Sequence, residues 1–292
     1  MRRTPLSLIA AAALAGCATA PQTATQTATQ SSAPAPASAT PAAAVAADAV
    51  PVHDSFTVQS RALGEARLVN VHTPAAYGAS PDGARFPVLY MPDGGIDEDF
   101  PHVVHTVDSL VAAGAIRPVI VVGVPNTQRR RDLTGPTRVA RDSTIAPRVG
   151  GSAEFRRFLR DELVPEVERR YRTTKERGIV GESLAGLFVV ETFLEAPTLF
   201  DHYIAFDPSL WWNRGALVDS AGARLAVLGA APRSLYLAAS RDAIDAQMTR
   251  LADLLRAAPP AGLRWEFHPR PDLTHATIFR AAEAAALASA LR

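Results

Sequence analysis

Short apolar runs that alternate with helix-like segments constrain the fold of this 292-residue chain more than any other feature. Arg85–Met91 and Ile116–Val124 are almost continuously apolar, and His202–Phe206 and Ser234–Ala239 repeat the pattern. Strands that are buried on both faces of a sheet have this composition. Helix-like segments lie between the runs or after them, at about 98–113, from Ser152 onward, at about 244–255 and at about 276–291. This alternation predicts an α/β domain with a mostly parallel sheet and helices on both faces.

Two segments near the start of this domain have a different pattern. Ser55–Ser60 and Ala66–Thr73 alternate apolar and polar residues, and Gly64 lies between them. This alternation predicts two half-exposed antiparallel strands, which commonly form the edge of a parallel sheet. With 48% hydrophobic residues the chain can bury a substantial core, so we expect one folded domain over residues 51–292.

The first residues have the pattern of a bacterial lipoprotein signal. Met1-Arg2-Arg3 is a positive n-region, 6–14 is a short apolar run, and Leu14-Ala15-Gly16-Cys17 resembles a lipobox. We therefore expect residues 1–16 to be a signal peptide and Cys17 to be lipidated, with an ordinary secretory signal as the alternative. Ala18 follows Cys17 where an Asp would suggest retention at the inner membrane. The resemblance implies a periplasm-facing lipid anchor in the cell envelope, most simply at the outer membrane.

The composition of the remaining segments narrows the possible partners. Residues 17–50 consist largely of Ala, Thr, Gln, Ser and Pro and predict a disordered tether. A net charge of +1 gives no reason to expect nucleic acid as a partner. Cys17 is the only cysteine, which excludes an intrachain disulfide and a cysteine nucleophile in the folded domain. His102 and His105 are three residues apart on an expected helix, but a third ligand is not evident, so we expect no metal and no cofactor.

The segment around Ser183 is the strongest candidate for chemistry. An apolar strand leads into Gly181-Glu182-Ser183-Leu184-Ala185-Gly186, and an apolar helix follows. This layout is typical of a nucleophile elbow, in which a serine is exposed on a strained strand-to-helix turn. The alternative is that Ser183 only caps the helix that follows it.

Partners for this serine occur at later strand ends. Asp242 follows the 234–239 strand, and His275 lies in the loop after the last strand. Ligands of open α/β sheets bind at the carboxyl ends of the strands, so these side chains should meet Ser183. The order Ser183, Asp242, His275 is that of α/β-hydrolases, in which the histidine activates the serine and the acid orients the histidine. Asp245 is the alternative acid, a Ser183–His275 pair that works without an acid is a further alternative, and His268 is the alternative base.

Two backbone N–H groups are expected to stabilise the oxyanion of an acyl-transfer reaction. The first is that of Leu184, which directly follows the serine and begins a helix. The second should come from the loop after the 85–91 strand, where Gly95 is the best candidate. A plain tight turn at Gly94-Gly95 is the other interpretation, and it is compatible with the first.

Several motifs together resemble the esterase branch of the α/β-hydrolases that includes esterase D-like enzymes and enterobactin-type siderophore esterases. Segments 88–95, 131–134, 181–188, 208–212 and 274–277 match the usual motifs of that branch in order, and the similarity spans roughly 55–292. The resemblance implies an α/β-hydrolase fold with Ser183 as nucleophile and His275 as base. Two positions depart from the usual pattern, Ala185 in place of glycine and Asp242 where relatives often carry Glu.

Other residues near the expected site are candidates for substrate binding. Arg129, Arg130 and Arg131 lie in a loop that should overhang the site, and Arg131 either binds substrate or pairs with Asp132. Trp211 and Trp212 either form an aromatic wall or pack in the core. Glu182 is expected beside the site without an acid–base role.

These observations predict an envelope-anchored serine hydrolase that cleaves small-molecule carboxylic esters through an acyl-enzyme. One alternative is an enterobactin-type siderophore trilactone esterase. An alternative from another class is a non-catalytic ligand-binding lipoprotein on the same fold.

Overall fold

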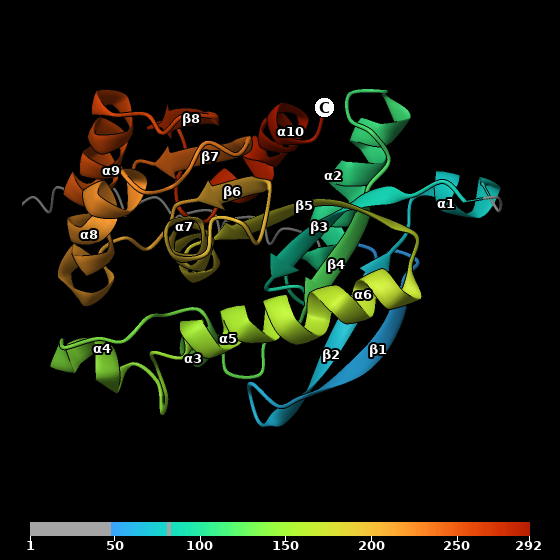
Figure 1. Cartoon of the computed structure of the whole chain (residues 1–292), viewed down its shortest axis with the longest axis horizontal. Coiled ribbons are helices and arrows are strands. Elements are labelled where there is room, and N and C mark those ends of the chain that lie inside the picture. Colours follow the sequence, from blue (N-terminus) through green and yellow to red (C-terminus); the bar gives the residue numbers. More distant parts are fainter. Residues whose placement is uncertain (1–47, 81–82) are drawn as a thin grey trace, which may run out of the picture. The chain divides into compact units, whose positions relative to one another are not determined.

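The computed structural model describes residues 48–80 and 83–292, and these form an α/β unit around one eight-stranded sheet (Figure 1). The predicted signal peptide, Cys17 and the tether up to residue 47 lie outside the described residues. Asp48, at the start of the described residues, is 2.6 Å from Arg280, and the Ala49 carbonyl accepts a hydrogen bond from His105.

The sheet has the strand order β1-β2-β4-β3-β5-β6-β7-β8. β1 and β2 are antiparallel to their neighbours, and β3 to β8 are parallel to one another. This confirms the predicted α/β-hydrolase architecture with an antiparallel N-terminal edge. The strands are β1 (Asp54–Ser60), β2 (Glu65–His72), β3 (Phe86–Pro92), β4 (Ile120–Val124), β5 (Thr173–Glu182), β6 (His202–Phe206), β7 (Arg233–Ser240) and β8 (Leu263–Arg270).

Helices cover both faces of the sheet, and each face has its own apolar core. In Figure 1, α2 (Phe100–Ala112) and α10 (Ile278–Ala290) lie together on one face. The other face is covered by α5 (Ser152–Phe158), α6 (Val164–Arg170), α7 (Leu184–Glu195), α8 (Ala216–Leu225) and α9 (Ala246–Ala257). Shorter elements are α1 (Ala75–Ala79), α3 (Arg129–Asp132), α4 (Ala140–Thr144) and the 3₁₀ turn Trp212–Gly215.

The predicted helix from Ser152 onward contains one irregular stretch. A π-helical turn, Leu159–Leu163, joins α5 to α6. Pro165 lies just after this turn and has no N–H with which to continue the i to i−4 ladder, so the wider turn accommodates it. The predicted apolar residues of this helix are buried nonetheless: Phe155, Phe158, Leu159, Leu163 and Val167.

The parallel strands bring the segments that follow them to one edge of the sheet. Asp93 follows β3, Ser183 follows β5, Asp207 follows β6, and Asp242 lies just after β7. The loop between β8 and α10 carries His275 to the same edge. Within 48–80 and 83–292, helices long and apolar enough to cross a bilayer do not occur.

Candidate active site

Ser183 lies on the turn between β5 and α7 with φ 59° and ψ −117°, a conformation that a residue with a Cβ rarely adopts. Two glycines permit this turn. A Cβ on Gly181 would lie 2.6 Å from the Cβ of Ala185, and one on Gly186 would lie 2.8 Å from the Phe206 carbonyl oxygen. The Ser183 N–H also donates to that carbonyl at 3.0 Å. The turn therefore has the strained geometry of a nucleophile elbow, and the small side chain of Ala185 fits the tight packing there.

The Ser183 side chain does not cap α7, since it accepts no hydrogen bond from the first turn of that helix. Its Oγ instead lies 3.5 Å from Ser209 Oγ. Ser183 faces a cavity of 330 Å³. The other residues that line this cavity are Asp207, Pro208, Ser209, Trp211, Asp242, Ala243, Asp245 and His275.

His275 enters this cavity from the loop before α10, and its side chain is 48% exposed. Its Nδ1 lies 3.0 Å from an oxygen of Asp207. The alternative base, His268, lies within β8, stacks on Tyr236 and bonds to Glu266 at 3.0 Å. The structure therefore brings His275, and not His268, into the cavity of the serine.

The carboxylate that contacts the His275 ring is that of Asp207, and not that of Asp242 as the residue order predicted. Asp207 Oδ2 also accepts a hydrogen bond from Ser240 Oγ, and Oδ1 accepts one from Ser240 N–H, both at 2.6 Å. Asp242 Oδ2 instead accepts the backbone N–H of His275 at 2.8 Å. Sequence reasoning missed Asp207, although it directly follows a buried strand, which is the criterion that selected Asp242.

Asp245, the other candidate acid, has a structural role. Its Oδ1 accepts the backbone N–H groups of Gln247 at 2.9 Å and Met248 at 2.8 Å. It is therefore the N-cap of α9, a position that Asp favours because it satisfies free N–H groups of the first turn.

The charges around His275 favour a basic imidazole. The hydrogen bond to Asp207 raises the pKa of His275, the charges of Glu182 and Asp242 add to this, and desolvation opposes it. Burial by itself raises the pKa of Asp207, but hydrogen bonds from His275 and Ser240 outweigh it, so that the pKa of Asp207 is lowered. An ionised carboxylate next to a basic ring is the arrangement that a general base requires.

Glu182 precedes the serine at the end of β5 and is a second carboxyl group close to this charge cluster. Burial raises its pKa to about 7, while the charge of His275 opposes the rise and those of Asp99 and Asp207 add to it. Its Oε1 is buried and has no hydrogen-bond partner in the part of the chain that the structure describes. Glu182 does not line the cavity of Ser183, and its charge contributes to the raised pKa of His275.

The two expected oxyanion donors differ in the structure. Leu184 is the first residue of α7, so its N–H has no acceptor inside the helix. The Gly95 N–H donates to Glu98 Oε2 at 2.8 Å, and Asn126 Nδ2 holds the other oxygen of this carboxylate at 2.7 Å. Gly95 can serve as an oxyanion donor only when the Glu98 side chain moves away.

The three arginines expected in a loop lie in α3, a single helical turn within the long connection between β4 and α5, and we call this part of the connection the arginine loop. Acidic side chains bind Arg129 and Arg131. Arg131 bonds to Glu65 at 2.7 Å and to Asp132 at 2.6 Å. Of the two roles expected for Arg131, these contacts correspond to the ion pair. Arg129 binds both carboxylate oxygens of Asp93 at 2.7 Å. A cavity of 510 Å³ beside this loop is lined by Arg129, Arg130, Arg131 and Arg148 together with Thr127, Gln128, Ala146 and Pro147.

The two tryptophans have different environments. Trp211 is 52% exposed and lines the catalytic cavity, as a substrate-contacting wall would. Trp212 is buried, and its Nε1 donates to the Gly135 carbonyl at 2.8 Å. Core packing thus accounts for Trp212, while Trp211 faces the site.

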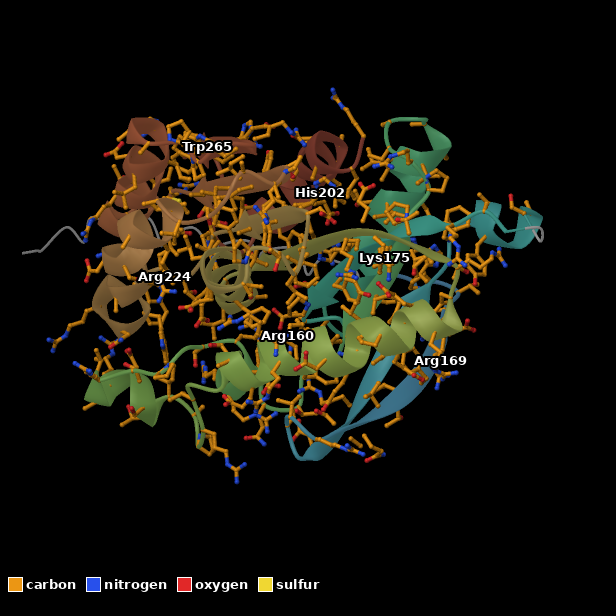
Figure 2. All side chains as sticks on the ribbon, in the orientation of Figure 1. Arg160, Arg169, Lys175, His202, Arg224 and Trp265 are labelled. Atoms are coloured by element: carbon orange, nitrogen blue, oxygen red, sulfur yellow. The ribbon has the colours of Figure 1, made fainter. Side chains whose placement is uncertain are left out.

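Two larger cavities, of 600 and 490 Å³, share His202 and Arg264. Figure 2 labels His202 and Lys175, which lie at or near the starts of β6 and β5 and so mark the end of the sheet opposite to Ser183. The linings of these two cavities contain neither Ser183 nor His275. Volume alone would select the 600 Å³ cavity, but the reactive side chains lie in the cavity of 330 Å³.

The histidine pair on α2 is engaged in other contacts. His102 bonds to Glu283 at 2.7 Å and to Asp99 at 3.2 Å, and His105 bonds to the Ala49 carbonyl. Over residues 48–80 and 83–292, groups of three or more His, Cys, Asp or Glu side chains arranged for a metal ion are not found.

Comparison with known proteins agrees with this fold. The fold is that of the α/β-hydrolases. The family model described as "Putative esterase" matches residues 60–243, more than half of the chain. The chain therefore belongs to this esterase family.

Individual relatives are named for siderophore chemistry. The chain is 33% identical over 148 residues to ferri-bacillibactin esterase BesA of Bacillus subtilis, covering 46% of this chain and 51% of that protein. It is 28% identical to the siderophore triacetylfusarinine C esterase of Aspergillus fumigatus, covering 55% and 57%. The matches thus span about half the length of these relatives. An IroE-like serine hydrolase of Shewanella oneidensis superposes with a TM-score of 0.72 at 25% identity, covering 82% of this chain and 79% of that one.

Proposed function

We propose that this chain is a serine esterase that hydrolyses carboxylic esters through an acyl-enzyme. The observation that carries the proposal is that the strained turn of Ser183 and the ring of His275 share one cavity, with a buried carboxylate behind the ring. Membership of the esterase family supports the same reaction.

In the proposed reaction His275 Nε2 takes the proton of Ser183 Oγ as the oxygen attacks the ester carbonyl carbon. The Leu184 N–H stabilises the oxyanion of the tetrahedral intermediate. The alcohol leaves with the proton that His275 held, and an ester to Ser183 remains. Water then attacks this acyl-enzyme, giving its proton to His275, and the acid product leaves as the Ser183 hydroxyl is restored.

For the substrate we propose esters of the siderophore kind, such as catecholate trilactones. Relatives named as siderophore esterases support this class. The half-exposed Trp211 offers an aromatic surface inside the cavity. Arg130 and Arg148 line the cavity beside the arginine loop, where they suit an anionic ligand because a guanidinium forms strong hydrogen bonds to negatively charged oxygens.

Replacement of Ser183 by alanine tests the proposal. S183A should abolish turnover of p-nitrophenyl butyrate and of an enterobactin-type trilactone, each assayed with and without bound ferric iron. Ser109→Ala on the exposed face of α2 is the matched control and should retain wild-type turnover. Turnover that survives in S183A would overturn the serine mechanism. Tight binding of a trilactone by a wild-type protein that does not cleave it would favour the ligand-binding lipoprotein.

We further propose that Cys17 is lipidated and anchors the enzyme to the cell envelope, facing the periplasm. The support is the sequence pattern of residues 1–17 alone. Expression of the full chain and of Cys17→Ser, followed by membrane fractionation, tests this proposal. The wild type should sediment with outer membranes and the variant should be released, whereas membrane-bound C17S would contradict the anchor.

A further inference from the structure

Asp207 combines a fully buried carboxylate with a backbone conformation that residues other than glycine rarely adopt. Its side chain is completely buried, and its backbone has φ 41°, which turns the chain sharply as β6 ends. The backbone N–H of Asp207 donates to the Ala238 carbonyl of β7 at 2.9 Å. The carboxylate is therefore fixed by the backbone of two neighbouring strands before it makes any side-chain contact.

The partners of this buried carboxylate are a serine and a histidine. Ser240 supplies two hydrogen bonds, and His275 Nδ1 supplies the third at 3.0 Å. Two other buried acids at this edge or near it, Asp93 and Asp132, are instead bound by arginines. Among the described residues, the salt bridges of Asp207 include no arginine or lysine. A protonated His275 ring is therefore the cation that can balance its charge.

Asp242 holds the same histidine in a different way. Its carboxylate accepts the backbone N–H of His275 at 2.8 Å, and its own N–H donates to Ser240 Oγ at 3.1 Å. The residue itself is exposed to solvent. This contact fixes where the loop passes over the strand ends, but it leaves the orientation and tautomer of the imidazole to Asp207.

We propose that Asp207 is the positioning residue that orients the His275 ring for the reaction, and that Asp242 positions only the loop that carries it. The inference rests on the proposed serine esterase function. When Ser183 Oγ loses its proton, that proton moves to Nε2, while the Nδ1 proton stays on the ring and is shared with Asp207 in a hydrogen bond. The charge pair that results is an ionised Asp207 and a protonated His275, with no proton transferred to the acid.

The position of the acid follows from the sheet. β6 and β7 are adjacent and parallel, with Phe206 beside Ala238 in register. An acid after either strand can thus reach a histidine that arrives from the loop before α10. The order of the three residues along the chain becomes Ser183, Asp207, His275, in which the acid comes one strand earlier than the residue order predicted.

The test compares Asp207→Asn with Asp242→Asn in the otherwise unchanged protein. D207N keeps the shape of the side chain but favours the wrong tautomer of His275, so kcat/KM for p-nitrophenyl butyrate should fall by about 10³- to 10⁴-fold, mainly in kcat. In D242N the kcat/KM for the same ester should fall far less. The acidic limb of the kcat/KM–pH profile should move to lower pH in D207N, because the contact that most raises the pKa of His275 is lost. In D242N it should move less.

Two further measurements keep the outcome clear. Asp142→Asn removes a buried carboxylate that binds Thr137 and the backbone of Asn213, so it should cost stability without the loss of kcat. Proton NMR should show a downfield Nδ1–H signal of His275 in the wild type and in D242N, and not in D207N. The rate of S183A gives the residual turnover without the nucleophile, against which D207N and D242N are compared.

A large loss in D242N with nearly normal kcat and an intact downfield signal in D207N would overturn the assignment of the acid, while the serine mechanism would stand. Activity retained in S183A would instead overturn the proposed function itself. A poorly folded D207N is recognised by its thermal unfolding curve, and the NMR comparison of the wild type with D242N then decides the question: loss of the signal in D242N contradicts the proposal.

Discussion

Two histidine–carboxylate pairs lie near α10, and they differ in the use of the second ring nitrogen. His102 pairs with Glu283 of α10, and its other nitrogen bonds to Asp99. His275 pairs with Asp207 through Nδ1, and among the described residues its Nε2 has no hydrogen-bond partner. Both nitrogens of the His102 ring are therefore hydrogen-bonded, whereas Nε2 of His275 can accept a proton.

The two pairs also differ in how far their side chains are exposed to solvent. The side chains of His102 and Glu283 are 4% and 5% exposed, and the ring packs edge-on against Phe279. His275 is half exposed, and only its acid is buried. A pair that is buried on both sides contributes to stability, whereas a buried acid with an accessible imidazole contributes to proton transfer.

The largest expected effect is a contrast between two variants, one that loses activity and one that loses stability. D207N should lower kcat/KM by about 10³- to 10⁴-fold with a small change in unfolding free energy. Glu283→Gln should lower the unfolding free energy by about 3 kcal/mol, since it removes the closer of the two carboxylates that pair with buried His102, but should leave kcat near the wild-type value. Urea unfolding and initial rates on both variants check this. Similar profiles for the two variants would erase the distinction between the pairs.

His102 should make the free energy of unfolding depend on pH. Burial by itself lowers its pKa, but hydrogen bonds to Asp99 and Glu283 prevail and raise the pKa to about 9. Because this exceeds the unfolded value of about 6.5, the stabilisation is complete below about pH 6.5 and is lost as the pH rises through about 9.

The difference in unfolding free energy between the wild type and His102→Gln should therefore be larger at pH 6 than at pH 9.5, by about 3 kcal/mol. Urea unfolding at the two pH values measures it. An equal difference at both pH values would mean that His102 is not charged in the folded protein.

A smaller effect should distinguish the charges that face His275. The acidic limb of the wild-type kcat/KM–pH profile should lie above the ordinary pKa of histidine, because the pKa of His275 is raised and the ring must be neutral to act as a base. Glu182→Gln removes one raising charge, so the limb should move to lower pH, and by less than in D207N. Glu191→Gln, a buried carboxyl change next to Ser152, is the matched control and should leave the limb in place. An unmoved limb in E182Q would exclude Glu182 from this cluster.

The smallest effect should concern substrate preference. The Arg130 side chain bonds only to the Ile145 carbonyl among its described partners, and Arg148 lines the same cavity. Changing both to Gln should raise KM for a ferric catecholate trilactone and leave KM for p-nitrophenyl butyrate unchanged. An equal change for both esters would argue against an anion site at this loop.

The strands and the serine were predictable because their patterns are local. β3, β4, β6 and β7 are continuous apolar runs, and the turn at Ser183 needs small residues on both sides of the serine. The boundaries were less exact, since the 116–124 run forms a strand only from Ile120. Periodicity shows which segments are buried but not where hydrogen-bonded pairing starts.

The choice of Asp207 over Asp242 and the partner of the second oxyanion donor were not predictable, because they depend on contacts between distant segments. Asp207 reaches His275 only through the turn after β6, and the Gly95 N–H is taken by Glu98. Arg131 fits both a binding role and an ion pair, and Glu65, which begins β2 and is far away in sequence, bonds to it in the structure. These choices are made by tertiary packing.

The most direct test of the central claim is the rate at which a fluorophosphonate labels the protein, followed by mass spectrometry to locate the adduct. The account predicts a single adduct on Ser183 in the wild type, with labelling that slows at low pH as His275 is protonated and is strongly slowed in His275→Ala and in D207N. An adduct on another residue, or equal labelling rates in the wild type and H275A, would contradict it.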